Sequence, residues 1–416
     1  MLLKCGLMLS TLYSLSLAQE LFNVQFEWKN GTNYTWPSYE EYQQAVKDKS
    51  YVADRNWVRS VKFWKENMYL TIHGWNTGVP VTLAVTPATP VNGNKSPLLK
   101  PYPNWDMQRL SGDCSDFQSI WSIEIDPMGR MWVVDSGNEL ITRTNSVECS
   151  PRLVILDLED EGKVLVNHVF PPKVVGLNKL VLGNIVLDHT NGGFAYISFE
   201  RYGHGLIVFS LQTLTSWKIK VGGHSITEMA LSPADGENGR VLYYVTEYPR
   251  EVYAIPTHVL QSRNLSSSTS QEVKKLNLKK DLWRGITVSN TGIIFLSTVY
   301  PVCVYEYSLK NSFSFTLRKK IEYALSKGER LNYPTFDEEG NLWFVRAYKN
   351  QIIVFPKTGM KSYQYYGNST VSQRSRVSAG EAKDELISAA SIIKLRTLDR
   401  QKQISVKECR NFYKLD

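Results

Sequence analysis

Histidine and cysteine are scarce in this chain, which has 6 His and 5 Cys among 416 residues. No two cysteines form a C-x-x-C pair and no two histidines form an H-x-x-x-H pair, so the spacings typical of zinc sites are missing. The G-x-S-x-G motif of a nucleophilic serine is missing as well. The sequence therefore predicts no metal, no cofactor and no catalytic residue, which disfavours an enzyme without excluding one.

Long apolar runs are missing after the N-terminus. The run at the N-terminus, Leu7–Leu17, follows Lys4 and ends in the small-x-small pattern Ser16–Ala18. These are the features of a signal peptide, and the run is too short to span a bilayer well; a membrane anchor is the alternative. We predict that residues 1–18 are cleaved, that the protein is secreted without a membrane span, and that residues 19–416 form a single domain.

Secretion into an oxidising compartment changes how the remaining cysteines are interpreted. Four of them follow the predicted cleavage site, and an even number predicts two disulfides with three pairings open: Cys114, Cys149, Cys303 and Cys409. Sequons for N-glycosylation agree with export and predict surface positions for Asn30, Asn33, Asn264 and Asn368.

Positive charge exceeds negative charge, but it is spread along the chain rather than gathered in one arm. The net charge is +8 and the pI is about 9.0. No segment has the density of a nucleic-acid-binding arm, so we predict no nucleic-acid partner. The pattern favours a soluble basic protein; the alternative is attraction to an anionic extracellular surface such as a glycosaminoglycan.

What the chain does contain is a repeated hairpin. Ile120–Gly137 consists of an apolar run, a tight Asp-Pro-x-Gly turn and a second apolar run. Similar units, each with alternating strands around a polar turn, make six copies that begin at Val58, Ile120, Ile185, Met229, Ile286 and Pro334. Because one small sheet cannot cover both of its faces, six such units predict an all-β, six-bladed β-propeller. A pair of β-sandwiches and a β-helix are the alternatives.

Helical patterns are few. Tyr39–Asp48 is a short candidate helix. Near the C-terminus, Ile387–Leu395 fits either part of a helix or a strand that completes the last blade. Polar segments between the strand groups are interpreted as loops, so they do not divide the domain.

Four ordered motifs resemble the insect yellow and major royal jelly proteins: Ser96–Trp105, Ile125–Gly137, Cys149–Leu158 and Phe194–Leu211. The resemblance covers nearly the whole chain after residue 18 and implies a six-bladed propeller, in agreement with the repeat. It also implies the disulfide pairs Cys114–Cys149 and Cys303–Cys409.

A propeller places its ligand site at a mouth of the central channel, near the start of each innermost strand. Those positions are Trp121, Asn184, Glu228, Arg284 and Asn332. An aromatic ring, two amides, a carboxylate and a guanidinium suit a small amphipathic ligand. The alternative is that Glu228 and Arg284 pair with each other and only satisfy the channel.

The chain is similar, more distantly, to sand fly salivary members of this family that bind biogenic amines such as serotonin. Aligned on Asn341–Phe344, the amine-binding positions of that branch fall near Asn332, Ala347 and Lys349. Ala347 has no amide group, and Lys349 would repel an ammonium if it faced the site. The resemblance thus predicts a channel ligand, a small aromatic, a catechol or a biogenic amine. The alternatives are a dopachrome-converting enzyme of the melanin pathway and a non-enzymatic structural or host-interacting protein.

Overall fold

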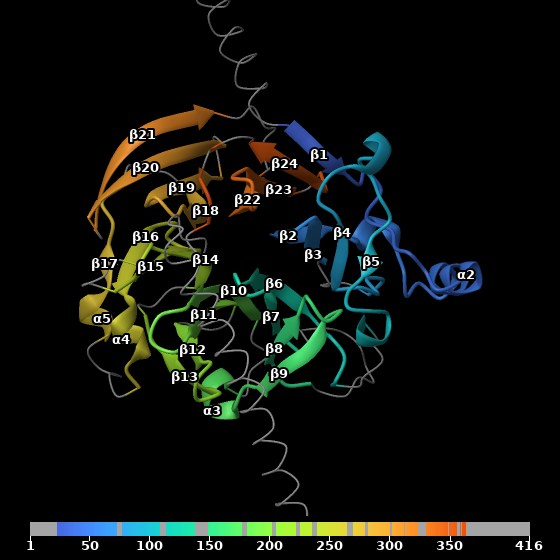
Figure 1. The fold of residues 1–416 in the computed structure, drawn as a ribbon, viewed down its shortest axis with the longest axis horizontal. Helices are drawn as coiled ribbons and strands as arrows, with labels where there is room; N and C mark the ends of the chain where they lie inside the picture. The colour runs from blue at the N-terminus through green and yellow to red at the C-terminus, as the bar shows by residue number, and fades with distance from the viewer. Residues whose placement is uncertain are drawn as a thin grey trace, which may run out of the picture.

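In the computed structural model, the described residues are 23–72, 77–108, 114–137, 149–176, 181–201, 205–221, 225–234, 239–263, 269–278, 282–299, 302–311, 313–322, 330–347, 349–355, 358 and 360–362. They form six four-stranded antiparallel sheets that stand in a ring around one axis (Figure 1). The prediction of an all-β, six-bladed propeller is confirmed.

Each blade is described from its innermost strand outward. Blade 1 consists of β2 (Val58–Trp64), β3 (Asn67–Ile72), β4 (Leu83–Pro87) and β5 (Lys100–Pro101). Blade 2 consists of β6 (Ile120–Ile125), β7 (Arg130–Asp135), β8 (Arg152–Asp157) and β9 (Lys163–Val169). Blade 3 consists of β10 (Val181–Asp188), β11 (Phe194–Arg201), β12 (Leu206–Ser210) and β13 (Thr215–Ile219). Blades 4 and 5 are β14 (Ile226–Leu231), β15 (Val241–Thr246), β16 (Val252–Pro256), β17 (Lys274–Lys275); and β18 (Trp283–Val288), β19 (Ile293–Thr298), β20 (Cys303–Asn311), β21 (Ser314–Glu322).

Blade 6 takes its strands from both ends of the described chain. It runs from β22 (Arg330–Phe336) through β23 (Leu342–Ala347) and β24 (Gln351–Phe355) to β1 (Asn23–Glu27). β1 thus forms the outer strand of the last blade. Ile387–Leu395, which was a candidate strand for completing that blade, lies outside the described residues. The N-terminal strand closes the ring.

A turn carboxylate explains the repeated hairpin. Asp126 accepts hydrogen bonds from the backbone N–H of Met128 (2.9 Å) and from the indole Nε1 of Trp132 (3.0 Å). Asp337 in blade 6 does the same with Glu339 (3.0 Å) and Trp343 (2.8 Å). Both turns share the pattern D-x-x-G-x-x-W, in which the Gly adopts a positive φ that other residues resist. One carboxylate therefore fixes the turn and anchors the tryptophan of the following strand.

The core is divided into six hydrophobic clusters, one at each junction between neighbouring blades. Strand β7 shows how a blade serves two junctions. Met131 and Val133 pack toward blade 1, whereas Trp132 and Val134 pack toward blade 3. Since successive side chains of a strand point to opposite faces, both faces of the sheet are buried, and the four central residues of the strand are all apolar.

Asn350, in the turn between β23 and β24, joins the N-terminal segment to blades 6 and 1. Its Oδ1 accepts from the N–H of Val58 (2.9 Å), and its Nδ2 donates to the carbonyl of Trp28 (3.1 Å) and to that of Asn56 (3.4 Å). The side chain is buried and the backbone φ is 49°. Asn350 therefore stabilises the junction at which the ring closes.

Short helices lie on the outside of the ring. The predicted helix is confirmed as α2 (Tyr39–Lys47), capped by the Ser38 hydroxyl, which accepts from the N–H of Glu41. The remaining helical segments are η1 (Ala53–Arg55), η2 (Val91–Gly93), η3 (Asp106–Gln108), α3 (Pro172–Val175), α4 (Thr257–Gln261) and α5 (Thr269–Glu272). None of the helices in the described ranges is long and apolar enough to cross a membrane.

The cysteine predictions are tested in part. Cys114 and Cys149 form a disulfide, as the resemblance implied. Cys303 is buried in the third strand of blade 5, where the sequence placed it, but Cys409 lies outside the described residues, so their pairing stays a prediction.

Two of the four predicted glycosylation sites can be placed. Asn30 is exposed, whereas Asn33 is half-buried and its Oδ1 accepts from the indole of Trp36 (3.1 Å). Asn264, Asn368 and the predicted signal peptide, residues 1–18, lie outside the described residues. Glycosylation and cleavage remain predictions.

We expect Asn350→Ala to lower the free energy of unfolding by about 1–3 kcal/mol, because it leaves the buried N–H of Val58 without its partner, while the carbonyls of Trp28 and Asn56 each lose one of their donors. Chemical denaturation measures the loss. Asn191→Ala is the matched control, since Asn191 has a similar φ of 52° but is exposed. Equal losses in the two variants would show that the backbone conformation matters and the closing hydrogen bonds do not.

Candidate ligand-binding site at the channel mouth

The six innermost strands surround a pocket on the propeller axis. Its volume is about 520 Å³, counting the part open to solvent. Every innermost strand contributes, through Ser60, Val61, Lys62, Ser122, Glu124, Asn184, Ile185, Val186, Glu228, Met229, Ala230, Ile286, Thr287, Tyr333, Pro334 and Thr335. The pocket thus lies where a propeller has its central channel.

Near its start, each innermost strand slips in register against its neighbour. In blades 1, 2 and 5 the shift falls at Arg59, Trp121 and Arg284. Bulges of this kind bend a strand and redirect side chains. We call this end of the channel the mouth and define it by Arg59, Trp121, Glu228, Arg284, Asn332 and Tyr333.

Glu228 is the carboxylate of the mouth and is only 2% exposed. Its Oε2 accepts from the N–H of Ile286 in blade 5 (3.2 Å), and its Oε1 accepts from the N–H of Tyr333 in blade 6 (3.1 Å). The carboxylate therefore ties three blades together. Gly285 makes the close approach possible, because a Cβ there would lie 3.3 Å from Oε2 and 2.6 Å from the Ser297 hydroxyl.

Burial raises the pKa of Glu228 to about 7, because the charged form loses its hydration. The positive charges of Arg284 and Arg59 and the two backbone N–H groups oppose that rise. Glu228 consequently exchanges a proton near neutral pH, where an ordinary carboxyl stays ionised.

Arg59 forms an aromatic sandwich at the mouth. Its guanidinium carbon lies 3.6 Å from the ring centroid of Trp121 and 5.0 Å from that of Tyr333. Its Nε donates to the carbonyl of Trp121 (3.2 Å). Cation–π stacking therefore joins blades 1, 2 and 6 at this end of the channel.

Amide side chains make the remaining contacts between blades. Arg284 donates from Nε to Oδ1 of Asn332 at 3.4 Å, from blade 5 to blade 6. Asn184 accepts from the N–H of Met229 at 3.1 Å, from blade 4 to blade 3. Deeper in the channel, Lys62 and Glu124 form an ion pair of 2.7 Å.

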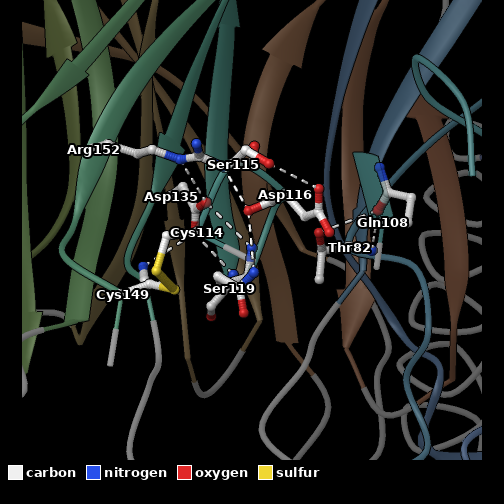
Figure 2. A network of polar contacts seen from close by, with 11 residues as sticks. Thr82, Gln108, Cys114, Ser115, Asp116, Ser119, Asp135, Cys149 and Arg152 are labelled. Atoms are coloured by element: carbon white, nitrogen blue, oxygen red, sulfur yellow. Dashed lines mark hydrogen bonds and ion pairs between the residues drawn. A yellow bond between two sulfur atoms is a disulfide. The ribbon is translucent and has the colours of Figure 1, made fainter. Parts of the chain in front are cut away.

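A buried network supports the strand that carries Trp121 (Figure 2). Asp135 accepts from the N–H of Ser119 (2.9 Å) and from Nε of Arg152 (3.2 Å). Figure 2 shows this pair beside the Cys114–Cys149 disulfide. The Ser119 hydroxyl then accepts from Nε1 of Trp121 (3.2 Å). Asp135, near the end of the Ile120–Gly137 hairpin, thereby fixes the position of Ser119, which in turn binds the indole of Trp121 at the mouth.

All five residues predicted for the site lie in innermost strands. Trp121, Glu228, Arg284 and Asn332 come together at the mouth, and Asn184 lines the pocket below. The alternative prediction was that Glu228 and Arg284 pair with each other. The charge of Arg284 opposes the rise in the pKa of Glu228, and the carboxylate oxygens accept from backbone N–H groups.

Sequence reasoning missed Arg59 and Tyr333. A signal for the first existed: Val58-Arg59-Ser60-Val61 has the same form as Ile120-Trp121-Ser122-Ile123, and both stretches carry the bulge. Of the amine-motif positions, Ala347 ends β23 and Lys349 is exposed in the turn after it.

Metal coordination finds no support in the described ranges. No three His, Cys, Asp or Glu side chains in them are grouped as a metal ion would require.

Comparison with known proteins identifies relatives. The chain is 29% identical over 332 residues to Major royal jelly protein 3 of Apis mellifera; the aligned region covers 73% of this chain and 58% of that protein. It is 24% identical over 283 residues to Dopaminechrome tautomerase of Drosophila melanogaster (62% and 60%), and 24% identical over 301 residues to Protein yellow of Drosophila yakuba (65% and 54%). The matched region thus spans less than two thirds of each relative.

The profile of the family described as Major royal jelly protein matches residues 118–224 and 220–365, more than half of the chain. The matched region begins just before β6 and runs past β24, so it takes in five complete innermost strands and the predicted site residues. By this match, this protein belongs to the yellow and major royal jelly protein family.

Proposed function

We propose that this protein is secreted and binds a small aromatic ligand at the mouth of its central channel. Export is supported by the N-terminal apolar run, the Cys114–Cys149 disulfide and membership of the family. The observation that carries the binding proposal is the convergence, at one end of an axial pocket, of stacked aromatic rings with a buried carboxyl that titrates near neutral pH.

Aromatic rings favour a planar ligand. Tyr333 lines the pocket and is half-buried, whereas Trp121 is buried and covered by Arg59. Stacking of two rings adds about 0.5–1.5 kcal/mol beyond the area they bury. Asn332 and Glu228 supply polar partners for a hydroxyl or a ring nitrogen.

Biogenic amines are one form of this ligand. Glu228 could neutralise an ammonium only in its ionised form, and Arg59 and Arg284 already act on it. The charges at the mouth therefore favour the aromatic part of the ligand over an ammonium group.

Calorimetric titration with serotonin, dopamine, octopamine and indole-3-acetamide tests the binding proposal. We expect at least one compound to bind, and Tyr333→Ala to weaken that binding up to about tenfold, since it removes a stacking partner. Tyr39→Ala is the control, because Tyr39 is 67% exposed on helix α2 at the periphery (Figure 1). Heats no larger than dilution for all four compounds would leave the structural or host-interacting role as the better explanation.

A second candidate function is tautomerisation of an aminochrome. A tautomerisation moves one proton between two positions of the same molecule, so it needs a group that takes up and returns a proton near neutral pH. Glu228 has such a pKa, and one relative is named Dopaminechrome tautomerase.

Decay of dopaminechrome, followed by its visible absorbance, tests the second candidate. We expect Glu228→Gln to abolish any acceleration over the uncatalysed rate, because an amide cannot carry the proton. Glu66→Gln should have no effect, since Glu66 is exposed in the β2–β3 turn. Equal rates with and without the wild-type protein would exclude this activity.

Glu228 should also make stability depend on pH. Its pKa rises from 4.5 to about 7 on folding, so the folded chain binds the proton more tightly. Stability is therefore greatest when the carboxyl is protonated and is lost as the pH rises through that interval, by about 3 kcal/mol at roughly 1.4 kcal/mol per pKa unit.

Denaturation of the wild type and of Glu228→Gln at pH 5, 6, 7 and 8 measures this dependence. We expect the wild type to lose stability relative to Glu228→Gln as the pH rises, whereas Glu66→Gln should run parallel to the wild type. A constant difference across the series would mean that Glu228 does not titrate in this range.

A further inference from the structure

Arginines gather around one side of the mouth. Arg284 in β18 and Arg330, the first residue of β22, lie on neighbouring innermost strands. Arg250 lies in the β15–β16 turn, which is bound to the start of β14 because the N–H of Glu247 donates to the carbonyl of Ser225 (2.9 Å). Three guanidinium groups from blades 4, 5 and 6 thus stand beside the strand that carries Glu228.

These groups are close enough to repel one another. Burial lowers the pKa of Arg250, and the charge of Arg284 lowers it further; a side-chain hydrogen bond with Tyr248 raises it in part, and the charge of Arg330 lowers it. Holding like charges together costs free energy unless something compensates them.

The compensation inside the described chain is incomplete. Nη1 of Arg250 and Nε of Arg330 are buried and have no hydrogen-bond partner among the described residues. Buried polar atoms are normally paired, so an unpaired guanidinium nitrogen on each of these two arginines points to a missing acceptor.

Carboxylates on the same elements are too few to supply that acceptor. Glu251 is engaged with Lys275 and with the Tyr253 hydroxyl (2.7 Å). Glu228 uses its oxygens for backbone N–H groups. Glu247 remains, so among the described residues the guanidinium groups around the mouth outnumber the carboxylates.

We propose that the mouth is selective for aromatic ligands that carry an anionic oxygen group, such as a carboxylate, and that Arg250 and Arg330 bind this group. The inference rests on the proposed function, because it names the class of the aromatic ligand. The planar fork of a guanidinium matches the two oxygens of a carboxylate, and such charge-assisted hydrogen bonds are about twice as strong as neutral ones. The ring of the ligand then lies toward Tyr333.

Three indoles of similar size and different charge test the proposal: indole-3-acetate, indole-3-acetamide and tryptamine. In calorimetric titrations at pH 7.5, the full chain should bind the acetate at least tenfold more tightly than the acetamide, and tryptamine most weakly. Arg250→Gln and Arg330→Gln should each bring the ratio of acetate to acetamide affinity toward one, by weakening acetate binding more than acetamide binding.

Arg318→Gln is the matched control, because Arg318 is an exposed arginine on the outer strand β21 and should leave the ratio as it is. Thermal unfolding of each variant identifies any that fail to fold. If either Arg250→Gln or Arg330→Gln fails to fold, the other variant serves as the test. Equal binding of acetate and acetamide, or tighter binding of tryptamine, would overturn the inference and leave the proposed function standing. If none of the three indoles binds, the inference falls, and the titrations with serotonin, dopamine and octopamine decide the proposed function.

Discussion

The structure depends on mutual covering of sheets that are too thin to shield themselves. Each blade has two apolar faces, and each face is buried only by the neighbouring blade, which produces six clusters around the ring. No blade can leave the ring without exposing two clusters to water. The same constraint demands closure, which β1 and the buried side chain of Asn350 provide by joining the N-terminal segment to blades 6 and 1.

The candidate site is a consequence of that closed ring. Glu228 accepts from N–H groups of blades 5 and 6, and Arg59 contacts rings of blades 2 and 6. No single blade therefore forms the site, although the innermost strand of each blade lines the pocket. Polar groups are tolerated here because the innermost strands bulge where the blades converge, so that side chains turn toward the axis instead of into the junctions.

Sequence reasoning succeeded where the signal is local. The hairpin repeats in each blade, so its alternation and its turn residues could be counted, and helix α2 carries its own capping serine. The Cys114–Cys149 bond followed from the family resemblance, and the repeat placed the five predicted site residues in innermost strands, whereas their role in binding stays a prediction. Arg59 and Tyr333 were missed because a bulge leaves little trace in a single strand; it becomes visible only when strands are aligned with one another.

By itself, the sequence determined the number of blades, the strands that form them and the apolar character of both blade faces, since these follow from side-chain alternation over a few residues. Only the tertiary structure decided which strand closes the ring, because β1 and the last blade are separated by almost the whole described chain. It also decided the chemistry of the mouth. The pKa of Glu228 and the crowding of the arginines arise from burial and from charges on other blades, and both act through space rather than along the chain.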